Sequence, residues 1–104
     1  MDTWEYTDRC VTVRLSGELD HHAAAKWREE IDDRVQNADC RLLRLDLSGL
    51  TFMDSSGIGL IMGRYRLMQS RGGTVEVVVP GGKLRQMLYL AGVDRLHIVK
   101  EETV

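Results

Sequence analysis

The chain has little cysteine, no long apolar run and no excess of charge of one sign. Its 104 residues include two cysteines, Cys10 and Cys40, and neither belongs to a C-x-x-C or Cys/His cluster. No apolar run approaches the roughly 20 residues that a membrane-spanning helix needs. The N-terminal stretch MDTWEYTDRC is acidic and polar, unlike a secretory signal. We therefore expect a cytoplasmic protein without a membrane partner, whose cysteines are reduced core residues.

The charge balance also excludes some functions. The sequence holds 14 Lys and Arg against 16 Asp and Glu, a net charge of −2, with both signs mixed along the chain. Nucleic-acid-binding proteins usually present a basic face, so no nucleic-acid partner is expected. Hydrophobic residues make up 43% and charged residues 29%, as in soluble globular proteins. The length fits one domain, residues 1–104.

Alternating apolar residues predict strands in five segments. In the stretch CVTVRLSG, Val11, Val13 and Leu15 lie on one side, which indicates a half-buried strand. The β-branched run TVEVVV indicates a buried strand. Strands are expected at residues 4–6 (a short edge strand), 10–17, 41–49, 74–79 and 95–99.

Between these strands, apolar residues recur at three- and four-residue steps, which is typical of amphipathic helices. Asp20 is expected to cap the first helix. Gly72-Gly73 and Gly92 are expected to end the second and third. The expected apolar stripes are Ala24, Trp27, Ile31 and Val35; then Ile58, Ile61, Met62, Tyr65 and Met68; then Leu84, Met87, Leu88 and Ala91.

The order of elements is β-β-α-β-α-β-α-β. Strands that alternate with helices imply right-handed crossovers and a parallel sheet, and the opening strand pair adds an antiparallel component. The predicted fold class is α/β, with a mixed, mostly parallel sheet of four to five strands.

A polar cluster interrupts this pattern within TFMDSSGIGLIMGRYR, residues 51–66. Asp54, Ser55 and Ser56 are expected in the loop that follows the second long strand. Asp20 occupies the equivalent loop after the first. In an open α/β sheet, functional groups collect at the carboxyl ends of strands. We therefore expect Asp20 and Ser55 near each other.

The cluster has two interpretations that involve no modification. Helix capping explains one such residue, because Asp and Ser side chains accept orphan backbone N–H groups, but it explains three in a row less well. A catalytic serine needs a G-x-S-x-G elbow and a histidine–acid pair, and neither serine has the first glycine. A metal site would have only His21, His22 and Asp20, and GGKL lacks the P-loop pattern. The third histidine is His97.

A third interpretation is that a serine here is phosphorylated. A serine at a helix N-terminus is accessible to a kinase, and a phosphate placed there meets free N–H groups and the positive end of the helix dipole. The helix should therefore survive, while about 1.5 to 2 negative charges are added to the surface. A partner that covers this edge would have to bury that charge.

The stretches GELDHH (residues 17–22) and TFMDSSGIGLIMGRYR (residues 51–66), with Gly72-Gly73, resemble the anti-sigma-factor antagonists. These are bacterial single-domain STAS proteins, and the likeness is greatest to the sporulation (forespore) type. The resemblance implies that the unphosphorylated chain binds an anti-sigma factor, a dimeric ATP-binding serine kinase, and so frees a sigma factor. It also implies that the kinase phosphorylates Ser55, that the phosphorylated form dissociates, and that a PP2C-type phosphatase restores it. The chain itself would be a monomer that catalyses nothing and needs no cofactor or metal.

The same resemblance assigns the partner-binding residues. Asp20 would belong to the surface that the kinase recognises, beside Asp54 and Ser55. Ser56, Gly57 and Ile58 would begin the helix that faces the partner.

The sequence departs from the family's pattern in two places. Only KEETV follows the last predicted strand, so the further C-terminal helix of the sporulation antagonists is expected to be short or missing. Pro80-Gly81-Gly82 stands where relatives more often have a Ser-Pro turn.

The alternative function is a STAS module that senses a small anion or nucleotide, or builds a scaffold, with Ser55 only a helix cap.

Overall fold

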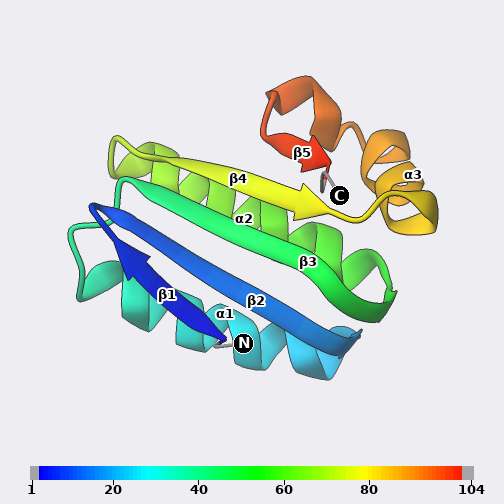
Figure 1. Ribbon diagram of the computed structural model, residues 1–104, viewed down its shortest axis with the longest axis horizontal. Helices are drawn as coiled ribbons and strands as arrows, with labels where there is room; N and C mark the ends of the chain where they lie inside the picture. Colours follow the sequence, from blue (N-terminus) through cyan, green and yellow to red (C-terminus); the bar gives the residue numbers. More distant parts are fainter. Residues whose placement is uncertain (1–2, 102–104) are drawn as a thin grey trace.

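The computed structural model describes residues 3–101, in which strands and helices alternate along the chain (Figure 1). The strand–helix order agrees with the one predicted from the sequence, with one short 3₁₀ segment, η1, added before the last strand. The elements are β1 (Trp4–Thr7), β2 (Cys10–Leu19), α1 (His21–Gln36), β3 (Leu42–Met53), α2 (Ser55–Ser70), β4 (Thr74–Val79), α3 (Gly82–Leu90), η1 (Val93–Leu96) and β5 (Val99–Glu101).

The five strands form one sheet in sequence order, β1-β2-β3-β4-β5. β1 runs antiparallel to β2, and the remaining neighbours are parallel. The sheet is thus mixed and mostly parallel, as predicted. Because the parallel strands point the same way, the carboxyl ends of β2, β3 and β4 lie at one edge, where the chain enters the three helices (Figure 1).

The helices α1 and α2 lie side by side on one face of the sheet (Figure 1). Between this helix layer and the sheet lies the core, because alternate strand residues point toward the helices. Burying each such Val or Leu contributes about 1.5–3 kcal/mol relative to leaving it exposed. The fully buried set from these elements includes Val13, Leu15, Leu43, Leu45, Leu47, Val77, Val79, Ile31, Val35, Ile61 and Met68.

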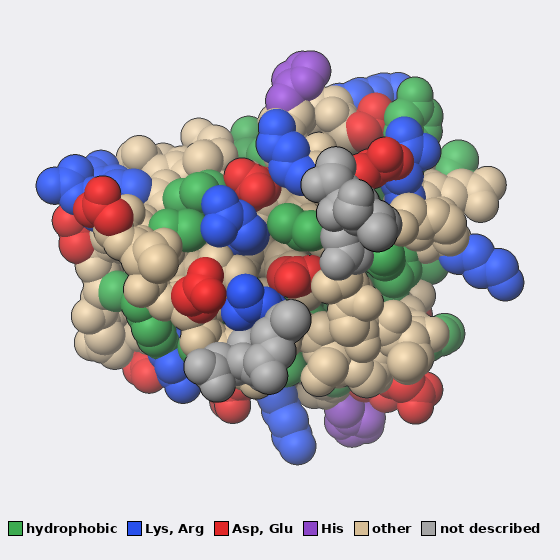
Figure 2. Space-filling model, viewed as in Figure 1, with side chains coloured by type: hydrophobic (Ala, Val, Ile, Leu, Met, Phe, Trp, Pro, Cys, Tyr) green, Lys and Arg blue, Asp and Glu red, His purple; other side chains and the backbone are tan. Residues whose placement is uncertain are grey.

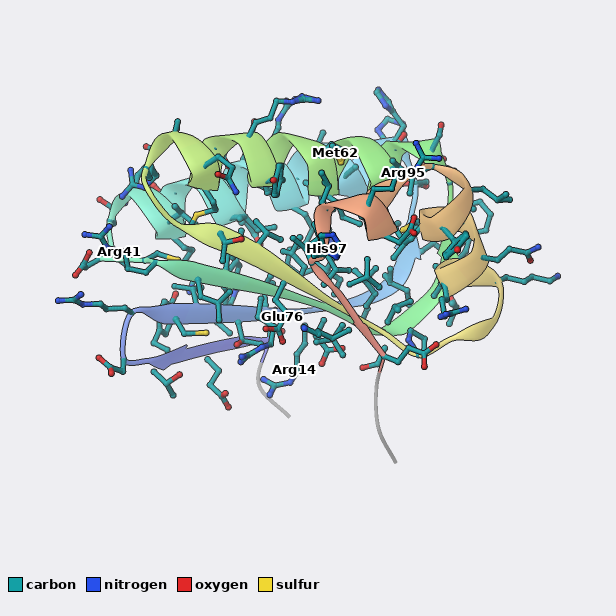
Figure 3. The ribbon with its side chains drawn as sticks, turned by 90° about the horizontal axis from the view of Figure 1, so that it is seen from above. Arg14, Arg41, Met62, Glu76, Arg95 and His97 are labelled. Carbon is teal, nitrogen blue, oxygen red and sulfur yellow. The ribbon has the colours of Figure 1, made fainter. Side chains whose placement is uncertain are left out.

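The opposite face of the sheet carries charged side chains and is covered by no helix of the described chain (Figure 2). Arg14 and Glu76 point away from the helix layer on this face (Figure 3). Arg44 pairs with Glu76 over 3.1 Å, and Arg14 lies 3.8 Å from Asp46. These cross-strand pairs give the open face a polar character. None of the helices within residues 3–101 is both long and apolar enough to span a membrane.

Three strands differ from the prediction by more than one residue at an end, and the first is β2, which continues to Leu19 instead of ending at residue 17. β3 extends to Met53 because Leu50 and Met53 still face the core beyond an irregularity in the β2–β3 register. The strand predicted at residues 95–99 is wrong in position, since Leu96 ends η1 and His97 adopts a left-handed conformation with φ of 59°. β5 therefore begins only at Val99, although Ile98 is buried as expected.

The buried stripe of α2 is also rotated from the predicted one. Ile61 and Met68 are buried as expected, but Ile58, Met62 and Tyr65 are only partly buried. The other buried positions on α2 are Gly57, Leu60 and Arg64. The cause is packing on two sides, because α2 contacts the neighbouring helix α1 as well as the sheet.

In the first and third helices the predicted stripes are confirmed in part. Trp27 is half-buried against Trp4, with ring centroids 6.3 Å apart, and Ala91 is exposed. Cys40 is a core residue, and burial raises the pKa of its thiol, while Cys10 is only half-buried. The prediction of a short or missing C-terminal helix falls mainly on residues 102–104, outside the described residues.

Candidate functional site

The carboxyl ends of β2 and β3 lie side by side at one edge of the sheet. Leu19 and Met53, the last residues of the two strands, are paired in the parallel register. The backbone N–H of Asp54 donates to the carbonyl of Leu19 over 3.3 Å. Asp20 and Asp54 directly follow the paired residues, which confirms that the segments containing Asp20 and Ser55 share one edge.

Each of these aspartates caps the helix that follows it. Asp20 Oδ1 accepts a hydrogen bond from the backbone N–H of Ala23 over 2.9 Å. Asp54 Oδ1 accepts one from the N–H of Ser56 over 2.8 Å. Both aspartates have extended backbone conformations, as N-cap residues require. The two carboxylates satisfy orphan N–H groups and place negative charge at the positive ends of α1 and α2.

Ser55 is the first residue of α2 and is exposed. Within residues 3–101 no hydrogen-bond partner holds its hydroxyl. The segment predicted as a loop of Asp54, Ser55 and Ser56 contracts to Asp54 alone, because β3 runs directly to Met53. The prediction that Ser55 could itself be the helix cap is wrong, since Asp54 makes the capping hydrogen bond; the sensing or scaffold function joined to that prediction is not tested by this geometry.

Gly57 fixes how closely the start of α2 approaches the strand ends. It is buried, and a Cβ added there would lie 2.3 Å from Met53 Cγ and 3.0 Å from Leu19 Cδ2. Its N–H donates to the carbonyl of Asp54 over 3.0 Å. The glycine thus lets the first turn of α2 lie directly on the two paired strand ends. Ile58, next in sequence, is half-buried and packs against the core.

A second feature, farther along α1 and α2, was not expected from the sequence. Arg64 of α2 is buried, and its Nε lies 2.9 Å from Asp32 Oδ1 of α1. The N–H does not point along this line, so the contact is an ion pair rather than a hydrogen bond. Burial lowers the pKa of Arg64, Asp32 raises it, and the nearby Arg28 lowers it further. Arg64 stands between Ile61 and Met68 of the predicted apolar stripe, but the sequence alone does not show which carboxylate would pair with it.

No hydrogen bond within residues 3–101 joins a histidine to Ser55 or Ser56, although His21 and Ser56 line one groove between α1 and α2. His21 and His22 are exposed and adjacent at the start of α1, with ring centroids 6.2 Å apart. His97 lies elsewhere, between η1 and β5. In the part of the chain that the structure describes, no three His, Cys, Asp or Glu side chains gather as metal ligands would. The edge therefore offers an exposed serine at the start of α2, where the capped start of α1 shares the same edge.

Comparisons with known proteins agree with this geometry. The STAS domain family matches residues 4–103. The anti-sigma F factor antagonist of Paenibacillus polymyxa is 38% identical over 92 residues, which cover 88% of this chain and 79% of that protein.

Two solved structures of an anti-sigma factor antagonist have the same fold. The structure of the antagonist SpoIIAA in its unphosphorylated form matches with a TM-score of 0.84 and 31% identity, covering 96% of this chain and 86% of that one. The Bacillus cell fate determinant SpoIIAA in its phosphorylated form matches with a TM-score of 0.76 and 31% identity, over 96% of this chain and 89% of that one. From its strand order, its capped edge and these similarities, the chain belongs to the STAS domain family.

Proposed function

We propose that this chain is an anti-sigma factor antagonist controlled by phosphorylation of Ser55. The unphosphorylated form binds an anti-sigma factor, a dimeric ATP-binding serine kinase, and so releases the sigma factor that it holds. That kinase phosphorylates Ser55 and the complex dissociates, until a PP2C-type phosphatase removes the phosphate. The relative from Paenibacillus polymyxa is named an anti-sigma F factor antagonist, so an anti-sigma F factor is the first candidate partner.

The observation that carries the proposal is the environment of Ser55. It is an exposed first residue of a helix, next to the capping carboxylate of Asp54 and beside the edge that Asp20 shares. A kinase can reach its hydroxyl without unfolding the helix. The first N–H groups of a helix and its dipole accommodate a phosphate there. Phosphorylation at this position therefore changes the surface rather than the fold.

The same geometry accounts for release of the partner. A phosphate adds about 1.5 to 2 negative charges at pH 7. At this edge they join the carboxylates of Asp20 and Asp54, which already neutralise the two helix ends. A partner that covers Ser55, Ser56 and Ile58 would have to bury the added charge. A thousandfold loss of affinity corresponds to only about 4 kcal/mol, which unpaired burial of a charge readily exceeds.

The test is phosphorylation by purified anti-sigma factors in the presence of ATP, with the modified residue located by mass spectrometry. Ser55→Ala should bind the anti-sigma factor and take no phosphate. Ser56→Ala is the matched control and should still be phosphorylated. Phosphate on Ser56 of the unmodified chain would contradict the assignment of Ser55. Failure of every anti-sigma factor to bind would contradict the proposed function itself.

A further inference from the structure

A groove runs between α1 and α2, beginning beside the candidate phosphorylation site. It has a volume of about 450 Å³ and is lined at one end by Ser56, which follows Ser55. Its walls include the small residues Ala24 and Ala25 of α1, and Gly59 and Gly63 of α2. Along α2 it spans about two helical turns, or roughly 10 Å.

The two glycines of this groove have no explanation in packing. Both lie inside α2, where glycine costs about 0.5–1 kcal/mol relative to alanine. A Cβ added at Gly59 or Gly63 would meet no atom within 4 Å. Gly57 is different, since a Cβ there would clash with Met53. Because glycine has no Cβ, Gly59 and Gly63 leave the space between the two helices open.

The charged side chains that line the groove are cationic. Arg64 lines it from α2 and Arg28 from α1, and no carboxylate belongs to the lining. The Arg64 side chain is 9% exposed, and its Nε lies 2.9 Å from Asp32 Oδ1. No residue within 3–101 accepts a hydrogen bond from its terminal nitrogens Nη1 and Nη2, and these atoms are not fully enclosed. Arg64, whose terminal N–H groups donate no hydrogen bond within residues 3–101, therefore belongs to the lining of this open groove.

We propose that this groove receives an acidic side chain of the anti-sigma factor, whose carboxylate binds between Arg64 and Arg28. The proposal rests on the proposed function and extends its docking surface from Ser55 along α1 and α2. A planar guanidinium pairs with a carboxylate through two parallel N–H groups, a geometry that Arg64 Nη1 and Nη2 leave available. The apolar walls and the length of two turns suit a peptide segment better than a single small anion.

The first arm of the test measures affinity for the anti-sigma factor. Gly63→Leu fills the groove from an open position, and the change should not lower the melting temperature because glycine is the weaker helix former. We expect it to weaken binding by about tenfold or more. Arg28→Gln should weaken binding in the same direction. Arg66→Gln is the matched control, because Arg66 is exposed on α2 outside the groove. Unchanged affinity of Gly63→Leu and Arg28→Gln would overturn the proposal.

The second arm needs no anti-sigma factor, so it separates the groove from the proposed function. A short acetylated oligoglutamate peptide is titrated into the ¹⁵N-labelled chain at low salt, and inorganic phosphate is titrated separately. The peptide should shift the amide resonances of Gly59 and Gly63 and the Nε resonance of Arg64, and Gly63→Leu should abolish the shifts. Shifts with phosphate alone would make the groove a small-anion site and overturn the proposal. Absence of shifts with both probes would also overturn it, whether or not an anti-sigma factor binds.

Discussion

Asp54 and Ser55 are adjacent residues with separate tasks. The carboxylate of Asp54 holds the first turn of α2 through the N–H of Ser56, and so leaves the hydroxyl of Ser55 exposed. The sequence alone could not divide these tasks, because Asp and Ser are both good N-caps. It could place the cluster at the edge of the sheet, since functional groups of α/β proteins gather at the carboxyl ends of strands.

Gly57→Ala should destabilise the fold. The added methyl group would lie 2.3 Å from Met53 Cγ, and the buried methionine would have to move into a packed core. Such overpacking typically costs about 1–3 kcal/mol. Thermal and urea unfolding measure the loss. Gly59→Ala is the control at an open position of the same helix and should be neutral or stabilising. Equal stability of the two variants would contradict the close approach described at Gly57.

Asp20→Asn separates a capping role from a recognition role. Asparagine caps a helix about as well as aspartate, so the melting temperature should change little. If the charge of Asp20 meets a basic group of the anti-sigma factor, the variant should bind more weakly and be phosphorylated more slowly. Calorimetric titration and an initial-rate phosphorylation assay measure the two effects. Unchanged values of both would remove Asp20 from the docking surface and leave it as a cap alone.

At the scale of whole elements, α1 and α2 are joined by a charged pair at their contact. Arg64 and Asp32 face each other across the two helices, and the arginine side chain is 9% exposed against 30% for the aspartate. The hydrophobic periodicity predicted both helices correctly. It could not predict the rotation of α2, because an arginine is not read as a buried residue until a partner from another helix is known.

Asp32→Ala should destabilise the fold because it leaves the Arg64 charge buried without its partner. Leaving a buried polar group unpaired costs about 1–3 kcal/mol, and more for a charged group. Because the Asp32 side chain is 30% exposed, water can reach this position in the variant, and we expect a loss of free energy of unfolding within that range. The control Glu29→Ala changes an exposed carboxylate of the same helix and should be nearly neutral. Chemical unfolding checks both. A double variant, Asp32→Leu with Arg64→Met, should recover much of the loss, and a loss equal to the sum of the single changes would argue against a coupled pair.

Across the whole molecule, the two faces of the sheet have different roles. One face carries α1 and α2 and holds the core, while the other bears charged side chains of both signs (Figure 2), among them the pair Arg44–Glu76. The strand and helix order followed from the sequence, since periodicity reports which residues are buried. The late start of β5 did not, because the left-handed conformation of His97 has no signal in the apolar pattern. The groove between α1 and α2 was also missed, since it depends on how two helices pack.

Ser55 is the exposed first residue of α2, so under the proposed function its phosphorylation should change the surface and leave the fold intact. The direct measurement compares the unphosphorylated chain with a chain that carries phosphoserine at position 55. Calorimetric titration gives the affinity of each for the anti-sigma factor, and a thermal melt gives the stability of each. We expect phosphorylation to lower the affinity about a thousandfold, or by about 4 kcal/mol, with melting temperatures that differ by only a few degrees. Equal affinities, or a phosphorylated chain that is largely unfolded, would contradict it.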